Sequence, residues 1–266
     1  MPSYVVTGAS RGIGFEFTNQ LSADASNTVF ALVRSPSTAT QLHELAKSAA
    51  GTIVVVKADI LNQAAIAEAV KVVAEHTGGK LDVLINNAAA IDSTKAWSLD
   101  AWPSSDALEE DLVNNFRTNA IAPIHVTNAF LPLLRAAPAA KAITISSGAG
   151  DPDFVRNVAG GWAAHAGYGM AKAALNVAVA KYAASMRASG GKIVFLAISP
   201  GIVDTSKPGD RTAEEQAGYE SFVRFLGAER ALSPVESVSL MLPLIARWTL
   251  EDSGAFISQY GNKEWV

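Results

Sequence analysis

The chain has 266 residues, of which 49% are hydrophobic and only 17% are charged, a composition typical of a folded domain with a sizeable core. Its net charge of -4 offers no basic surface to nucleic acid or to an anionic membrane, so we expect neither as a partner. There is no cysteine, and the four histidines lack metal-ligand spacing, which excludes disulfides and thiolate catalysis and predicts no metal site.

Short runs of apolar, β-branched residues alternate along the chain with segments of helical length. Nearly continuous apolar strands are typical of a parallel sheet that is buried on both faces. The alternation predicts βαβ units and an α/β, three-layer, doubly wound (Rossmann) fold whose sheet has about seven parallel strands. The expected strands cover residues 4–6, 29–33, 53–56, 83–85, 142–145, 193–198 and 255–257.

The amphipathic segments between these runs predict helices from Gly12 onward, at about 38–49 and at about 63–76. Two longer helices are expected at about 108–136 and 167–189. Pro123 falls inside the first of them and predicts a kink there, because proline cannot donate a backbone hydrogen bond.

No repeat or linker divides the chain, so we expect a single domain over residues 1–266. The stretch at about 202–232 breaks the alternation, with Pro208, Gly209 and Gly218 among polar residues, and is a candidate substrate lid. No apolar stretch approaches the roughly 20 residues that span a bilayer. No signal-like segment precedes the first strand, so a cytoplasmic location is expected.

A glycine-rich turn directly follows the first strand and opens the first helix. Three glycines at this place allow a tight turn and a close approach of the backbone to a pyrophosphate, which the helix N-terminus attracts. The alternative is that the glycines serve only the packing of helix on strand. The candidate nucleotide-binding residues of this turn are Gly8, Ser10, Arg11, Gly12, Ile13 and Gly14.

The end of the second strand bears on the choice between NAD and NADP. A carboxylate there would bind a ribose 2′-hydroxyl, whereas this chain has Arg34, and Arg11 lies in the glycine turn. Two guanidiniums suit a phosphate dianion, so we expect NADP(H); the alternative is that both are solvated surface residues. Asp59, followed by Ile60, closes the third strand, where it would accept from the adenine amino group or cap the next helix.

Tyr168 and Lys172 are spaced so that a phenol and an ammonium share one face of a helix. A neighbouring cation lowers the pKa of a tyrosine, which makes it a better acid–base group near neutral pH. The pair alone is a weak signal, but it follows a strand that ends in Ser146 and Ser147, whose hydroxyls could face the same crevice.

In this order and spacing the chain resembles the short-chain dehydrogenase/reductase family over essentially its whole length. Arg34 and the segment 253–265 are similar to a branch of small carbonyl reductases related to the fly protein sniffer, and to some fungal polyketide ketoreductases. The matching features are the glycine turn, Asp59, Asn86, Asn87, Ala88, Asn119, Ser147, Tyr168, Lys172, Pro200 and Gly201.

The resemblance implies a role for each catalytic residue. Tyr168 would protonate the carbonyl oxygen, and Lys172 would hold the nicotinamide ribose and lower the tyrosine pKa. Ser147 would hydrogen-bond the substrate oxygen; Ser146 is its rival, and the glycines after Ser147 favour the latter. Asn119 would position a water in a proton relay through Lys172. At the cofactor, Asn86, Asn87 and Ala88 would border the adenosine ribose, and the nicotinamide end would contact Pro200, Gly201, Val203 and Thr205.

Three features depart from the family pattern. Ala89 stands where a glycine is usual, which predicts a slight displacement of the backbone beside the cofactor. The interval between Ser147 and Tyr168 is long, so residues 151–166 should form an extra loop at the active site that shapes the pocket or hinders dimerisation. The tail reads Gln259-Tyr260-Gly261-Asn262 where relatives often carry an Asp-Gly turn, a change expected to matter only locally.

The predicted function is NADPH-dependent reduction of a ketone or aldehyde. An aromatic-lined crevice would suit a small hydrophobic or aromatic carbonyl substrate; the alternative is that these aromatic residues only pack the loops. The rival functions are an NAD(P)-dependent alcohol dehydrogenase acting oxidatively and a cofactor-binding sensor without turnover. A homodimer and a homotetramer both remain open. The aromatic residues in question are Trp97, Trp102, Phe154, Trp162, Phe222 and Phe225.

Overall fold

A parallel β-sheet organises the chain in the computed structural model, which describes residues 1–92, 94–207 and 209–266; Pro208 of the predicted lid lies outside them. The sheet has seven strands in the order β3-β2-β1-β4-β5-β6-β7, and every neighbouring pair is parallel. This confirms the predicted doubly wound sheet. The strands are β1 (Ser3–Thr7), β2 (Thr28–Val33), β3 (Thr52–Lys57), β4 (Val83–Asn86), β5 (Lys141–Ile145), β6 (Val194–Ser199) and β7 (Ala255–Ser258).

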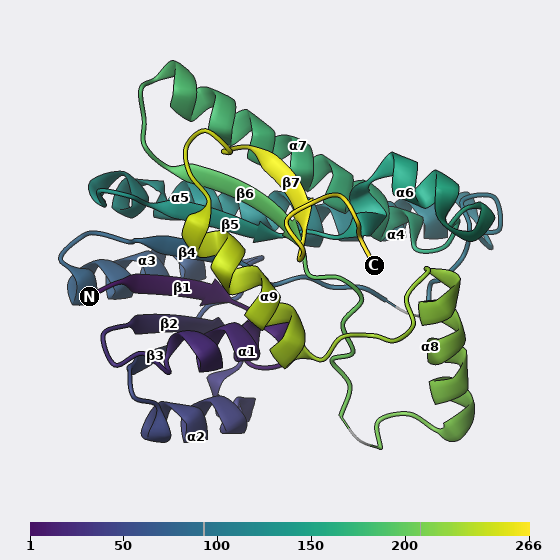
Figure 1. Cartoon of the computed structure of the whole chain (residues 1–266), viewed down its shortest axis with the longest axis horizontal. Coiled ribbons are helices and arrows are strands. Elements are labelled where there is room, and N and C mark those ends of the chain that lie inside the picture. Colours follow the sequence, from purple (N-terminus) through teal and green to yellow (C-terminus); the bar gives the residue numbers. More distant parts are fainter. Residues whose placement is uncertain (93, 208) are drawn as a thin grey trace.

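The strand order reverses between β1 and β4, where Val5 pairs with Phe30 on one side and with Leu84 on the other. Ligands of such sheets bind outside the carboxyl ends of the strands at this reversal. In Figure 1 β1 runs from left to right, and α6 and α8 lie on the right, beyond the carboxyl ends. Most candidate site residues come from strand ends, loops and the first turns of helices on this side.

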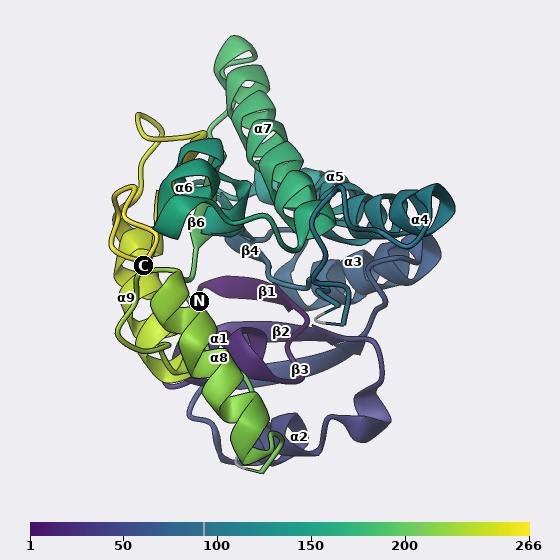
Figure 2. The ribbon, with the colours of Figure 1, turned by 90° about the vertical axis from the view of Figure 1, so that its right-hand side faces the viewer.

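Helices cover both faces of the sheet and bury two separate cores. One core joins the sheet to α3, α5 and α7 and includes Phe30, Phe130 and Phe195; the other joins it to α1, α2 and α9 through Phe17 and Met241. Figure 2 shows α8 nearest the viewer, on the carboxyl side. The α-helices are α1 (Gly12–Leu21), α2 (Thr40–Ser48), α3 (Gln63–Thr77), α4 (Ser105–Phe116), α5 (Ala122–Ala136), α6 (Pro152–Asn157), α7 (Ala166–Ala188), α8 (Ala213–Phe225) and α9 (Pro234–Arg247).

The helix expected at 108–136 is divided by a π-helical turn, Arg117–Ile121, between α4 and α5. Within it the Ala122 N–H donates to the Arg117 carbonyl, five residues back. Pro123 lies in the first turn of α5 and has no N–H for the Asn119 carbonyl, so the irregularity falls just before the proline.

Three helices, α6, α8 and α9, were not predicted by the sequence analysis. The predicted lid at 202–232 contains α8, which begins with a capping box: the Thr212 hydroxyl accepts from the Glu215 N–H, and the Glu215 carboxylate accepts from the Thr212 N–H. The predicted extra loop at 151–166 contains α6, which Asp151 caps. The described residues contain no helix long and apolar enough to cross a membrane.

Candidate active site

The glycine turn lies against the segment that follows β4. Gly8 and Gly12 have positive φ angles of 69° and 57°, which favour glycine. A Cβ at Gly14 would overlap the Gly8 carbonyl oxygen and the Asn87 side-chain amide. The first turn of α1 therefore packs directly on the turn, with its N–H groups at the carboxyl edge of the sheet.

Thr7 joins this turn to the Asn86–Ala88 stretch. Its hydroxyl accepts from the N–H groups of Asn87 and Ala88, each at 3.0 Å, and the Asn87 side chain donates to the Thr7 carbonyl at 2.9 Å. Asn86 is buried and donates to Thr127 at 2.8 Å. The Asn86 side chain thus connects β4 to α5, and the Asn87 side chain connects the residues after β4 to β1. The sequence analysis did not predict these structural roles. Ala89 is exposed and has no positive φ, so alanine fits this backbone without strain.

The two arginines at the predicted 2′-phosphate position, Arg11 and Arg34, are both exposed. Asp59 is half-buried after β3, and its carboxylate accepts from the Leu61 N–H at 3.0 Å. The N-cap of α3 is Asn62, whose side chain accepts from the Ala65 N–H at 3.1 Å. The alternative interpretation of Asp59 as this N-cap is therefore wrong.

The segment after β6 meets the glycine turn from the other side of the crevice. A Cβ at Gly12 would lie 3.1 Å from the Thr205 methyl group, so Gly12 and Thr205 are in close contact.

The C-terminal tail packs on the start of this segment. The Pro200 carbonyl accepts a hydrogen bond from the Ser237 hydroxyl at 2.7 Å. Gly201 has a φ of 80° and lies against the side-chain amide of Gln259. The tail thus packs on the predicted cofactor segment, and Trp265 also lies against Gly148. Val203 forms a bridge with Leu232.

Ser147, Tyr168 and Lys172 come together between the end of β5 and the start of α7. The Lys172 ammonium is buried, donates to the Ile145 carbonyl at 2.8 Å and lies 5.6 Å from the centre of the Tyr168 ring. The Ser147 hydroxyl lies close enough to the Tyr168 phenol to lower its pKa. The Ser146 hydroxyl donates to Asn176 instead, so Ser147 is the serine that faces the phenol.

Burial controls the charge states of this group. Burial lowers the pKa of the Lys172 ammonium to about 8. Burial also raises the pKa of the Tyr168 phenol to about 12, and the nearby Ser147 hydroxyl lowers it by less. The sequence analysis predicted a pKa lowered by the lysine charge, which is wrong for this structure: the ammonium donates to a backbone carbonyl, and the loss of water around the phenol is the larger effect. At neutral pH the phenol is protonated and can donate a proton.

Asn119 is fully buried in the π-helical turn. Its side chain accepts from the Ala90 N–H at 2.8 Å and donates to the Ala90 carbonyl at 2.7 Å and to Asn115 at 3.1 Å. The side chain thereby fixes the loop after β4. Its backbone carbonyl receives no α-helical hydrogen bond, because residue 123 is a proline.

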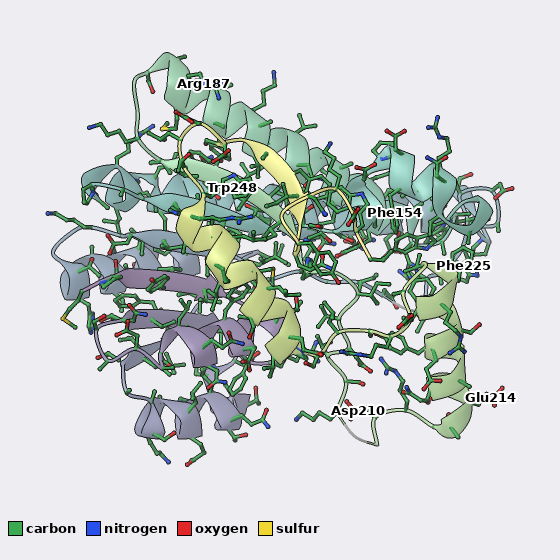
Figure 3. The ribbon with its side chains drawn as sticks, viewed as in Figure 1. Phe154, Arg187, Asp210, Glu214, Phe225 and Trp248 are labelled. Atoms are coloured by element: carbon green, nitrogen blue, oxygen red, sulfur yellow. The ribbon has the colours of Figure 1, made fainter. Side chains whose placement is uncertain are left out.

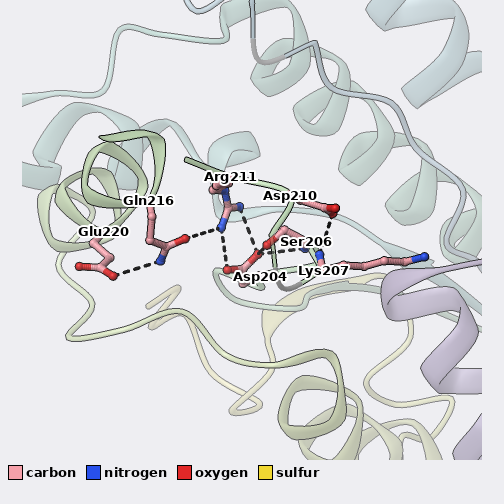
Figure 4. Close-up of polar contacts among 7 residues, drawn as sticks. All are labelled: Asp204, Ser206, Lys207, Asp210, Arg211, Gln216 and Glu220. Carbon is pink, nitrogen blue, oxygen red and sulfur yellow. Dashed lines mark hydrogen bonds and ion pairs between the residues drawn. The ribbon is translucent and has the colours of Figure 1, made fainter. Parts of the chain in front are cut away.

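An ion pair anchors the predicted lid (Figure 4). The Arg211 guanidinium donates to both oxygens of Asp204, at 2.8 and 3.1 Å, and lies 3.8 Å from the centre of the Tyr219 ring. Gln216 accepts a further bond from Arg211 at 3.2 Å. Asp204 directly precedes Thr205, so this ion pair ties α8 to the segment that contacts the glycine turn.

The aromatic residues predicted to line a crevice form separate groups. Trp97 and Trp102 stack edge to face with ring centres 4.9 Å apart, and Trp162 meets Phe222 of α8 at 5.7 Å. Figure 3 shows Phe154 on α6 and Phe225 at the end of α8, both on the carboxyl side. Trp97 and Phe225 are exposed. The rings that pack together agree with the alternative that these aromatic residues pack the loops, whereas an aromatic-lined substrate crevice stays a prediction.

Comparison with known proteins places the chain in a family. The family model for short chain dehydrogenases matches residues 3–216. The chain is 43% identical to short-chain dehydrogenase/reductase AacuF of Aspergillus aculeatus and 38% identical to short chain dehydrogenase virK of Hypocrea virens, with all of each chain covered.

Solved structures agree with this assignment. The NADPH-bound carbonyl reductase from chicken fatty liver matches with a TM-score of 0.78 at 31% identity, covering 98% of each chain. Carbonyl reductase Sniffer of D. melanogaster matches with a TM-score of 0.78 at 23% identity, also over 98% of each chain, a likeness of fold. The chain belongs to the short-chain dehydrogenase/reductase family and is an oxidoreductase, as its sequence motifs predicted.

Proposed function

We propose that the protein reduces a ketone or aldehyde to an alcohol with NADPH. The observation that carries the proposal is the contact of Ser147 with the Tyr168 phenol beside the buried Lys172 ammonium, at the carboxyl edge of the sheet. The glycine turn lies at the same edge. The carbonyl reductase from chicken fatty liver, at 31% identity, is described as NADPH-bound, which supports the choice of reaction and cofactor.

The residues present fit an NADP-type dinucleotide. Gly8 and Gly12, with positive φ, make a tight turn, and Gly14 lets α1 pack directly on it, so that the N-terminus of α1 lies at the carboxyl edge of the sheet, where a pyrophosphate would bind. The exposed guanidiniums of Arg11 and Arg34 suit a 2′-phosphate. Asp59 and Ile60 would border the adenine, and Pro200, Gly201, Val203 and Thr205 the nicotinamide end.

The bound nicotinamide would supply the hydride that adds to the carbonyl carbon. Ser147 donates a hydrogen bond to the carbonyl oxygen, and Tyr168, protonated at neutral pH, transfers its proton to that oxygen as the alcohol forms. A phenol with a pKa near 12 is a weak acid, so the phenolate left after proton transfer needs stabilisation. The positive charge of Lys172 stabilises that phenolate. Lys172 and the Asn119 carbonyl lie on the route by which Tyr168 regains a proton.

The test is turnover of NADPH and of NADH with a panel of aromatic ketones, quinones and aliphatic aldehydes, followed by nicotinamide absorbance. We expect turnover with NADPH, little with NADH, and a loss of about a hundredfold to ten-thousandfold in Tyr168→Phe. The matched control is Tyr182→Phe on the same helix, whose hydroxyl donates to Asn128 and takes no part in the site.

Other results would decide against the proposal. A protein that binds neither nucleotide contradicts it outright. NADPH binding with no turnover, unchanged by Tyr168→Phe, would indicate the cofactor-binding sensor. Efficient oxidation of alcohols with NAD, and no reduction with NADPH, would indicate the oxidative dehydrogenase.

A further inference from the structure

A cavity of about 460 Å³ lies beside the first turns of α7. Its walls come from residues 98–100, from the stretch between Ala149 and Val155, and from residues 162–166 together with α7. Most of these groups are apolar, and Asp100 is exposed at the edge. This volume is within the range of pockets that enclose drug-sized molecules.

The cavity is separate from the catalytic group. Ser147, Tyr168 and Lys172 do not line it, whereas Gly169, Met170 and Ala173 do. At 3.6 residues per turn, Met170 and Ala173 are turned by about 160° and 140° around α7 from Tyr168. The backbone of α7 therefore stands between the cavity and the phenol, and a carbonyl compound held there could not reach Tyr168.

Two residues that line the cavity, Trp162 and His165, each carry a buried ring nitrogen with no partner among the described residues. These atoms are Nε1 of Trp162 and Nδ1 of His165. Buried polar atoms in proteins are almost always hydrogen-bonded, and an indole nitrogen can only donate. Burial lowers the pKa of His165, although the charge of Asp111 opposes this, so the imidazole is neutral at pH 7.

We propose that this cavity binds an uncharged aromatic small molecule with an oxygen that accepts a hydrogen bond from Trp162 Nε1. The apolar walls suit an aromatic ring, the neutral His165 offers no charge, and the Asp100 carboxylate disfavours an anion. The oxygen satisfies the indole donor, and His165 Nδ1 donates to or accepts from the same group according to its tautomer.

The site has a direct connection to the lid. The rings of Trp162 and His165 lie 5.7 and 6.4 Å from that of Phe222 on α8. His165 has a left-handed backbone, with a φ of 58°, and its carbonyl accepts from the Gly169 N–H at 3.1 Å, next to Tyr168. A ligand that holds these two rings in place also restrains α8. Binding itself does not rest on the proposed reductase activity.

The experiment measures binding of 2-naphthol, a neutral aromatic molecule with one oxygen, to the full chain by calorimetry. Trp162→Phe keeps an aromatic ring but removes the donor and should weaken binding about threefold to tenfold. Ala173→Leu fills the cavity from α7 and should abolish binding. The control is Trp248→Phe, because Trp248 Nε1 already donates to the Asp252 carbonyl; Figure 3 shows Trp248 far from Phe154 and Phe225.

Binding should persist in the presence of saturating NADPH and in Tyr168→Phe, which separates this site from the reductase centre. NADPH affinity and circular dichroism of Ala173→Leu should match the parent protein, so that a loss of binding is not a loss of fold. The proposal is overturned by an absence of binding to the parent protein, by undiminished binding to Ala173→Leu, or by competition with NADPH.

Discussion

The two sides of the crevice are held together in different ways. On the glycine-turn side, Thr7, Asn87 and the glycines make short, neutral hydrogen bonds and backbone contacts. On the lid side, a partly exposed ion pair between Asp204 and Arg211 ties α8 to the segment after β6. Close packing leaves no room to move, whereas an ion pair near water can break and re-form at little cost. We therefore propose that a rigid glycine-turn side faces a lid that can open.

The largest difference in stability is expected between two glycine-to-alanine variants, one on each side of the crevice. Gly14→Ala places a Cβ into the Gly8 carbonyl and the Asn87 amide, and should cost at least about 3 kcal/mol of unfolding free energy and abolish nucleotide binding. Gly218→Ala adds the same methyl to α8, where nothing lies within 4 Å, and should stabilise the protein by about 0.5–1 kcal/mol. Urea unfolding measures both, and similar costs for the two variants would contradict the comparison.

A second prediction concerns Lys172, at the junction of the two sides. Its pKa is about 8 in the folded protein and about 10.4 when unfolded, so the unfolded chain binds more protons between these values. Stability contributed by this group is therefore reduced below pH 8 and recovers as pH rises toward 10, by up to about 3 kcal/mol. Above pH 10 the raised pKa of Tyr168 acts in the opposite direction.

Lys172→Met should be more stable than the parent protein at pH 7, and the difference should close by pH 10, in urea unfolding at both pH values. Its turnover should be lost, because the charge is needed for the reaction. The control is Lys181→Met, an exposed lysine of the same helix. A pH-independent difference between Lys172→Met and the parent protein would show that the buried ammonium is not desolvated as described.

Much of the glycine-turn side could be predicted from the sequence, because its signals are local. The strands, the first helix and the glycine turn follow from periodicity and from residues adjacent in the chain. The lid could not be predicted in this way. Asp204 and Arg211 pair across a loop, and the tail reaches Gly148 through Trp265 only in the folded chain. One missed signal was local: Thr212 and Glu215 have the spacing of a capping box and mark the start of α8.

The pKa of Tyr168 was mispredicted for a related reason. Spacing placed Lys172 on the same helical face, but only the fold shows that the ammonium donates to Ile145 and that both groups are buried. In the same way, Asn86 is a buried partner of Thr127, a contact between residues far apart in the sequence. Burial and long-range partners decide the pKa of Tyr168 and the role of Asn86, and residue spacing in the sequence predicts neither.

Arg34 provides the third prediction, on the rigid side. Arg34→Asp replaces an exposed cation with an anion, and should weaken NADPH binding about tenfold to a hundredfold while NADH binding holds or improves. Arg187→Asp is the matched control, because Arg187 lies in the last turn of α7, and Figure 3 shows it far from Phe154 and the carboxyl side. Titration of both nucleotides by fluorescence measures the effect, and an unchanged NADPH affinity would contradict the assignment of the 2′-phosphate to this side.

The smallest effect on stability is expected from the ion pair of the lid. Burial raises the pKa of Asp204, but hydrogen bonds from Arg211 and Ser206 outweigh it and lower the pKa to about 2. The stability from this carboxylate is thus present above pH 4 and is lost as the pH falls toward 2. Because the pair is partly exposed, Asp204→Asn should cost only about 1 kcal/mol of unfolding free energy.

The same variant should have a larger effect on the lid than on the whole protein, because the bonds that it removes connect α8 to one segment only. Limited proteolysis should cut Asp204→Asn within residues 202–232 faster than the parent protein, while the glycine-turn side resists as before. Glu44→Gln removes a surface pair with Lys47 on α2 and is the control, expected to leave cleavage unchanged. If Asp204→Asn instead destabilised both sides equally, the lid would be part of the rigid body, and the distinction between an opening lid and a fixed cradle would fail.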